Sequence, residues 1–154
     1  MVVITSVNKI YNFLKKNKEE IFYESDLKCL LFAELMKDKR YNLTTEWRIR
    51  KNKAVDILVY KKKNLDIQNK TIDIKKIEKL IELKFTFYGH NLNGVKKDIL
   101  KLKTLRGSAK ELYAIYFDVG KEPISKEKLE MFKEFSSKNG VKFIYRYLNI
   151  EIAY

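Results

Sequence analysis

The chain has 154 residues, which suits one domain with one hydrophobic core and excludes two domains of ordinary size. Hydrophobic residues make up 45% of the chain and aromatic residues 13%, which excludes wholesale disorder. Lysine and arginine number 33 against 20 acidic residues, and the resulting formal charge of +13 predicts a polyanionic partner, nucleic acid above all.

Apolar residues at helical spacing predict a first helix over residues 6–20, with Ser6 as its candidate N-cap. A second helix is predicted over residues 24–38, where a run of leucines supplies the apolar face. Residues 45–50 alternate between polar and apolar side chains and predict a strand, whereas residues 54–60 are more apolar and predict a central strand. Residues 61–76 form a polar, lysine-rich excursion with room for a short hairpin.

The second half of the chain alternates between strands and helices. In chain order we expect a strand at residues 79–87, a helix at 94–105, a strand at 111–118, a helix that Ser125 caps and that ends before Gly140, and a strand at 141–148. The complete order is α-α-β-β-β-α-β-α-β. Strands paired as a meander and then joined by helical crossovers predict an α/β fold, with a mixed central sheet flanked by helices and residues 1–154 in a single domain.

The chain has one cysteine and one histidine. Cys29 excludes a disulfide framework and favours a reducing compartment, and its apolar neighbours predict a place in the core. His90 lies in a predicted loop, where we expect a solvated side chain in preference to a general base or a phosphate contact. No apolar stretch reaches transmembrane length and the first residues lack a signal-peptide pattern, so we expect a cytoplasmic protein that does not enter a membrane.

Two predicted strands each carry an acid in an otherwise apolar stretch, Asp56 in the first and Glu82 in the second. A buried carboxylate is costly unless it is paired, hydrogen-bonded or bound to a metal. Side chains alternate along a strand, so Glu82 and Lys84 share a face, and antiparallel pairing brings the start of one strand to the end of the other. We therefore expect Asp56, Glu82 and Lys84 to converge at one edge of the sheet. Two carboxylates and a backbone carbonyl suit a hard cation such as Mg²⁺.

At these residues the sequence resembles the PD-(D/E)XK nuclease superfamily, which includes restriction endonucleases and archaeal Holliday-junction resolvases. The resemblance covers roughly residues 24–118, and the matching motif is Asp56 followed by Glu82-Leu83-Lys84. The element order is also similar to that of the family, so the resemblance implies a restriction-endonuclease-like fold. Val55 stands where the family has its proline, and the glutamine and tyrosine found on the later helix of many related nucleases are absent.

The resemblance implies a Mg²⁺-dependent endonuclease, with Mn²⁺ as a substitute metal and DNA favoured over RNA. Metal ligation falls to Asp56, Glu82 and the carbonyl of Leu83, while Lys84 serves the attacking water or stabilises charge in the transition state.

Many family members add a glutamate near the start of the helix that precedes the sheet. Glu24 matches that place and is expected to support the same metal or a second one, and Glu34 on the same helix is the alternative. Small nucleases of this type often cut two strands as dimers, so a homodimer is expected by analogy.

Lysine-rich segments are the expected contacts to nucleic acid. They hold phosphate groups electrostatically and do not specify sequence. Besides residues 75–76, the lysines assigned to this role are Lys61, Lys62, Lys63, Lys96, Lys97, Lys101 and Lys103.

Three alternatives stay open. In the first, the acids are core ion-pair partners: Asp56 pairs with Arg48 or Arg50, and Glu82 pairs with Lys84 or another lysine. In the second, the domain keeps the nuclease fold and binds nucleic acid without cutting it. In the third, the surface charge only confers solubility.

Overall fold

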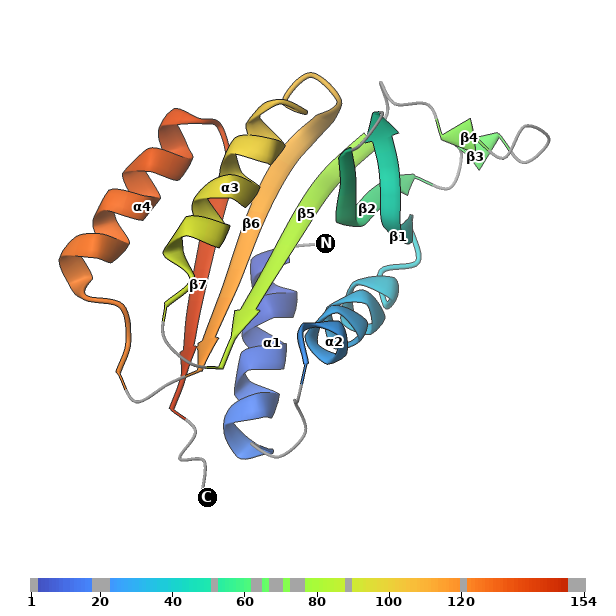
Figure 1. Cartoon of the computed structure of the whole chain (residues 1–154). Helices are drawn as coiled ribbons and strands as arrows, with labels where there is room; N and C mark the ends of the chain where they lie inside the picture. Colours follow the sequence, from blue (N-terminus) through green and yellow to red (C-terminus); the bar gives the residue numbers. More distant parts are fainter. Residues whose placement is uncertain are drawn as a thin grey trace.

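The computed structural model describes residues 3–17, 23–50, 53–61, 65–66, 71–72, 77–87, 90–119 and 122–149. Within these ranges the chain forms four helices and seven strands (Figure 1). The helices are α1 (Val3–Lys16), α2 (Glu24–Met36), α3 (Leu92–Lys103) and α4 (Lys126–Lys138). The strands are β1 (Tyr41–Arg50), β2 (Lys53–Lys61), β3 (Leu65–Asp66), β4 (Thr71–Ile72), β5 (Ile77–Thr86), β6 (Ala109–Val119) and β7 (Lys142–Leu148).

Five strands form one mixed sheet in the order β1-β2-β5-β6-β7. The first two neighbouring pairs are antiparallel and the last two are parallel. Parallel neighbours need a long crossover, and α3 and α4 provide the two that link β5 to β6 and β6 to β7. The predicted α/β fold with a mixed central sheet and flanking helices is therefore confirmed. β3 and β4 pair with each other antiparallel within the predicted excursion over residues 61–76.

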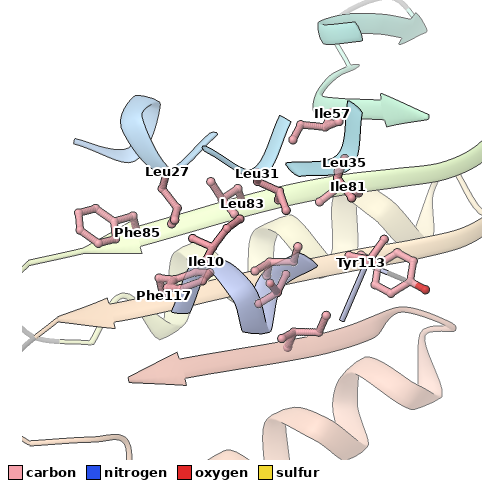
Figure 2. Packing of buried hydrophobic residues seen from close by; sticks show 14 of the residues in the cluster. Ile10, Leu27, Leu31, Leu35, Ile57, Ile81, Leu83, Phe85, Tyr113 and Phe117 are labelled. Carbon is pink, nitrogen blue, oxygen red and sulfur yellow. The ribbon is translucent and has the colours of Figure 1, made fainter. Parts of the chain in front are cut away.

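Helices α1 and α2 cover one face of the sheet (Figure 1). Helix α2 presents Leu27, Leu31 and Leu35 at a spacing of four residues, which aligns them in one stripe. Figure 2 shows this stripe against Ile81 and Leu83 of β5. Each fully buried leucine stabilises the fold by roughly 1.5–3 kcal/mol, so this stripe fixes where the start of α2 lies on the sheet.

Helices α3 and α4 cover the opposite face. Val95, Ile99 and Leu102 recur at helical spacing on α3 and pack against Leu80 of β5, as well as Leu58 of β2. Successive side chains of β5 therefore point alternately into the core under α1 and α2 and into the core under α3 and α4. A polar side chain on β5 must also face one of these two helix layers.

Several predicted boundaries differ from those observed. Helix α1 starts at Val3, so Ser6 lies buried inside the helix and is not its N-cap. The helix ends at Lys16 with two lysines in its last turn, which interact favourably with the negative end of the helix dipole. Strand β1 starts at Tyr41 because residues 41–44 extend the pairing with β2, which the polar residues there had concealed. Ser125 caps α4, and Gly140 follows with the positive φ of 70° that favours glycine.

The expectation of a buried cysteine was wrong, because Cys29 is exposed. It lies two residues after Leu27 on α2, and two residues turn a helix by about 200°, so the buried stripe and Cys29 point in opposite directions. Among the described residues, no helix combines the length and apolar character that a bilayer crossing requires.

The feature that positions the candidate site is the separation of β2 from β5. Their pairing reaches Ile57 opposite Ile81, and β5 then continues to Thr86 with only β6 beside it. The second half of β5 therefore leaves alternate backbone N–H groups without a strand partner on the β2 side, and each needs another acceptor.

Candidate active site

Asp56 lies where β2 leaves β5. One carboxylate oxygen, Oδ2, accepts a hydrogen bond of 2.7 Å from the backbone N–H of Leu83. Leu83 is the residue between Glu82 and Lys84, so this contact brings the Asp56 side chain onto the Glu-Leu-Lys motif. The expected approach of the two strands is confirmed, since β2 and β5 are antiparallel neighbours.

Glu24 reaches the same edge of β5 from a different element. It is the first residue of α2, and its Oε2 accepts the backbone N–H of Phe85 at 3.1 Å. The ammonium group of Lys84 lies 3.6 Å from the same oxygen. Two acids, Asp56 and Glu24, thus satisfy the consecutive outward N–H groups that β2 leaves open. The leucine stripe of α2 explains why Glu24 is available at this position.

Glu82 is the most buried acid of the motif, with 4% of its surface exposed. Burial and, to a smaller extent, the neighbouring Asp56 carboxylate together raise the pKa of Glu82 to about 8. The ammonium of Lys101 on α3 lies 2.7 Å from Glu82 Oε1 and opposes this shift. Among the described residues the Lys101 ammonium is the cation that faces this oxygen, and its direction departs from that of a well-aligned hydrogen bond.

Lys28 is a member of the site that the sequence did not single out. Its ammonium lies 2.9 Å from Asp56 Oδ1 and 2.5 Å from Glu46 Oε1. Burial alone would lower the pKa of Lys28, but the hydrogen bonds to Glu46 and Asp56 outweigh burial and raise it. One lysine among so many carries no distinguishing signal. Only its spacing of four residues from Glu24, which places both on one side of α2, could have indicated it.

Asp98 on α3 was also missed. Burial raises its pKa, and Lys84 and Lys101 act in the opposite direction. Asp98 and Lys101 are three residues apart and therefore lie on neighbouring turns of the same helix face, turned toward β5. Sequence reasoning assigned this helix to phosphate binding because of its lysines, and one acid among them gave no separate indication.

The donor set fits a hard divalent cation in its chemistry. Asp56 and Glu82 offer carboxylate oxygens, one of them buried without a hydrogen bond, and the strand supplies the Leu83 carbonyl. Lysine ammonium groups already hold both carboxylates, so a cation would have to displace Lys28 from Asp56 and Lys101 from Glu82. Within the described ranges, no three His, Cys, Asp or Glu side chains stand in an arrangement ready to hold a metal ion.

The structure separates the two candidate glutamates of α2. Glu24 contacts β5, whereas Glu34 pairs with Lys9 at 2.9 Å and with Lys37. These hydrogen bonds, chiefly that of Lys37, lower the pKa of Glu34. Glu34 is therefore an ion-pair partner of two lysines away from the motif, and Glu24 is the acid that lies with the motif.

The predicted nucleic-acid lysines fall into three groups. Lys96, Lys97 and Lys103 are exposed on α3. Lys101 lies on the same helix but points at Glu82, and Lys61 lies 3.9 Å from Glu78 on the neighbouring strand. Lys62, Lys63 and residues 75–76 lie outside the described residues, as do the side chains proposed as ion-pair partners of Asp56, Arg48 and Arg50.

The expectation for His90 was wrong. The ring is not simply solvated, because its Nδ1 lies 2.8 Å from Oδ2 of Asp118, a carboxylate that is 1% exposed at the end of β6. The two residues are 28 positions apart, and nothing in the local sequence links them.

Comparisons with protein-family models, with curated proteins and with solved structures found no match for this chain. The resemblance to the nuclease superfamily consequently depends on the motif, its element order and the geometry described above.

Proposed function

We propose that the protein is a metal-dependent nuclease that hydrolyses phosphodiester bonds in DNA. The observation that supports this most directly is the hydrogen bond from Leu83 N–H to Asp56, because it joins the two parts of the motif. Glu24 enters the same edge of β5 from α2, as the resemblance implies. Residues of α2, β2 and β5 thereby lie close together at the part of β5 that extends beyond its pairing with β2. They are Glu24, Asp56, Glu82 and Lys84.

Each residue has a role that its surroundings support. Asp56 and Glu82, with the Leu83 carbonyl, would hold Mg²⁺ or Mn²⁺, and the bound cation would supply Lewis acidity and neutralise phosphate charge. Lys84 is partly exposed and shares the edge with Glu24, so it is placed to orient water or to stabilise developing negative charge. Glu24 holds Lys84 and the β5 backbone in place.

Helix α3 offers the surface for the substrate. Asn93, Lys97 and Lys101 follow one another at intervals of four residues and so lie along one ridge of the helix. Lys101 marks where this ridge meets Glu82, and Lys97 continues it as an exposed cation. Phosphates bound along the ridge would bring a nucleic-acid strand to the carboxylates.

The test is cleavage of labelled linear, branched and single-stranded substrates with Mg²⁺, Mn²⁺ or EDTA. We expect metal-dependent cleavage by the parent and none by Asp56→Asn or Glu82→Gln, with nucleic-acid binding retained because phosphate contacts lie on lysines elsewhere. Glu34→Gln is the matched control, since it removes an acid from the same helix layer but outside the site. A parent that cuts no substrate in the panel would contradict the proposal.

A second candidate is a nucleic-acid-binding protein of the same fold without catalysis. The observation in its favour is that Asp56, Glu82 and Glu24 each already face a lysine ammonium group. Titration with Mn²⁺ distinguishes the two: the nuclease requires binding that Asp56→Asn weakens, whereas the inactive protein shows no such binding.

Two further expectations belong to this proposal. The single cysteine favours a reducing compartment, and we place the protein in the cytoplasm. A homodimer would let two sites act on two strands, and sedimentation with and without duplex would detect it.

A further inference from the structure

A second polar cluster lies at the carboxyl ends of β5, β6 and β7. Its centre is Asp118, which is buried and lies opposite Thr86 in the β5–β6 pairing. Tyr145 of β7 donates to Asp118 Oδ2 at 2.9 Å, and Thr86 donates to Oδ1 at 3.4 Å. His90 provides the fourth group, at 2.8 Å from Oδ2. A buried carboxylate that gathers this many donors is held in one position and, in turn, holds its partners.

The hydrogen bonds fix which nitrogen of His90 carries a proton. Tyr145 accepts from the backbone N–H of Ile124 and so directs its own proton to Asp118. A carboxylate accepts hydrogen bonds and cannot donate them, so Nδ1 of His90 must be the donor. The other ring nitrogen, Nε2, makes no hydrogen bond with the described residues, and about a third of the side chain is exposed. Asp118 therefore orients the ring through Nδ1, and the exposed Nε2 accepts hydrogen bonds in the neutral ring and donates one to an anion in the imidazolium.

This cluster lies on the same face of β5 as the candidate active site. Glu82, Lys84 and Thr86 are every second residue of β5, so their side chains share one face of the strand. Lys84 lies opposite Tyr116 of β6. The distance along the strand from Glu82 to Thr86 is about 13 Å, from the rise of roughly 3.3 Å per residue. A nucleic-acid strand that crosses the carboxylates would reach His90 within a few nucleotides.

The surroundings of His90 favour an anion. Tyr116 accepts the N–H of Asn91 at 3.1 Å, which holds the turn that leads into α3. The first turn of α3 contains no acid, so the positive end of the helix dipole is not neutralised. Lys97 is exposed on the second turn. The histidine, the helix start and the lysine present positive or donor groups on one side of the molecule.

We propose that His90, as the imidazolium with N–H groups at both ring nitrogens, donates Nε2–H to a backbone phosphate of the nucleic-acid substrate, a few nucleotides from the bond that is cut, with Asp118 as the residue that positions the ring. This inference rests on the proposed function, since it assumes a nucleic-acid strand on this face. The competing explanation is that the contact between His90 and Asp118 only fastens the loop before α3.

Two substitutions at position 90 separate these explanations. His90→Asn places an amide N–H near the position of Nδ1, so it can keep the hydrogen bond to Asp118 while Nε2 is lost. His90→Gln reaches the position of Nε2 and gives up the bond to Asp118. Lys133→Gln removes a charge from an exposed pair with Glu130 on α4 and serves as the control for a general change of charge.

The measurement is binding in EDTA to a series of duplexes, each with one phosphate replaced by an uncharged methylphosphonate. The parent should bind some of the modified duplexes more weakly than the unmodified one. At one of those positions His90→Asn should bind the modified and the unmodified duplex equally, because the contact to that phosphate is already missing. We expect His90→Asn to bind the unmodified duplex roughly 10-fold more weakly, with the melting temperature of the parent and a salt slope smaller by about one. His90→Gln should recover part of the affinity.

Three outcomes are decisive. If His90→Asn matches the parent at every modified position while the parent cleaves DNA, the phosphate contact is overturned and the nuclease proposal stands. If the position-specific loss occurs in a protein that never cleaves, the contact stands and the nuclease proposal fails. If the parent binds none of the duplexes, the phosphate contact fails, and the panel of linear, branched and single-stranded substrates decides the nuclease proposal separately.

Discussion

At the scale of single residues, the burial of Glu82 and the raised pKa of its carboxyl group have a direct effect on stability. It is buried beside another carboxylate, and one of its oxygens lacks a hydrogen bond. The ordinary response of such a group is to keep its proton, which agrees with the direction of its pKa shift. A divalent cation offers a different response, because it stabilises the charged form in place.

The first prediction is that stability falls as pH rises through the titration of Glu82. Its pKa is 4.5 ordinarily and about 8 in the folded protein, so between these values the folded state holds a proton that the unfolded state has released. The free energy of unfolding therefore decreases with pH across this window, by on the order of 3–5 kcal/mol, and levels off above it. Glu82→Gln should remove this dependence, as measured by urea unfolding in EDTA from pH 5 to pH 9.

Glu34→Gln is the control for that experiment. The pKa of Glu34 is lowered, so its contribution has the opposite sign: it is present above the ordinary value and is lost as the solution becomes more acidic. Parallel stability curves for the parent and Glu82→Gln would contradict a neutral, buried Glu82.

The second prediction concerns Lys28, which competes with a cation for Asp56. Lys28→Met keeps an unbranched side chain and removes the ammonium that lies 2.9 Å from the carboxylate. We expect Mn²⁺ to bind roughly five-fold more tightly, since the loss of a partly buried pair of this kind corresponds to about 1 kcal/mol. Calorimetric titration measures this directly. Lys37→Met, which removes one of the two lysine partners of Glu34, should leave the affinity unchanged, and equal affinities for the parent and Lys28→Met would refute competition.

At the scale of elements, the relation between α2 and β5 decides whether a site exists. The helix is anchored by its leucine stripe, and Glu24 at its start accepts the N–H of Phe85. One side chain therefore serves both as a backbone acceptor for a strand and as an acid beside Lys84.

The third prediction separates these two uses of Glu24. Glu24→Gln keeps an oxygen acceptor for Phe85 N–H and should preserve stability, whereas Glu24→Ala leaves that N–H without its partner and should cost about 1 kcal/mol. Both variants remove the charge, so both should lower metal-dependent cleavage. Melting temperature and cleavage rate, measured on the same samples, test the prediction. Equal stability of the two variants would mean that the hydrogen bond to Phe85 contributes nothing.

Much of this arrangement could be predicted from local pattern. Apolar stretches around Asp56 and Glu82 predicted two strands, and the assumption that they pair antiparallel placed both acids at one edge. Contacts between elements far apart in sequence could not be predicted this way. Lys28 resembles every other lysine in a basic chain, and the pairing of His90 with Asp118 requires the register of two parallel strands.

At the scale of the whole molecule, charge is the dominant property. A formal charge of +13 on one small domain creates a long-range field, and Lys101 of α3 contacts Glu82 while Lys97, one turn earlier on the helix, is exposed. The field draws a polyanion toward the protein, while Asp56, Glu82 and Glu24 place carboxyl groups beside β5, where the rest of the surface is rich in lysine.

The fourth prediction is that DNA affinity depends steeply on salt. Counterions released by lysine–phosphate contacts drive binding, so a protein with 6–10 such contacts loses about 10³–10⁵-fold in affinity between 50 and 200 mM salt. Lys97→Gln should reduce the slope of log K against log salt by about one, and Lys133→Gln, which removes a lysine paired with Glu130 on the neighbouring helix α4, should not. Fluorescence anisotropy across a salt series provides the slopes, and a flat response would exclude the electrostatic interpretation.

The uncovered half of β5 has one more consequence, which concerns assembly. A strand edge with open N–H groups is a template on which a second chain can add a strand and extend the sheet. Here the N–H groups of Leu83 and Phe85 are already taken by carboxylates, whose charge also disfavours an incoming backbone carbonyl. The acids that make this edge a candidate for chemistry therefore also protect the sheet against growth by strand addition, so their loss would expose this edge to self-association.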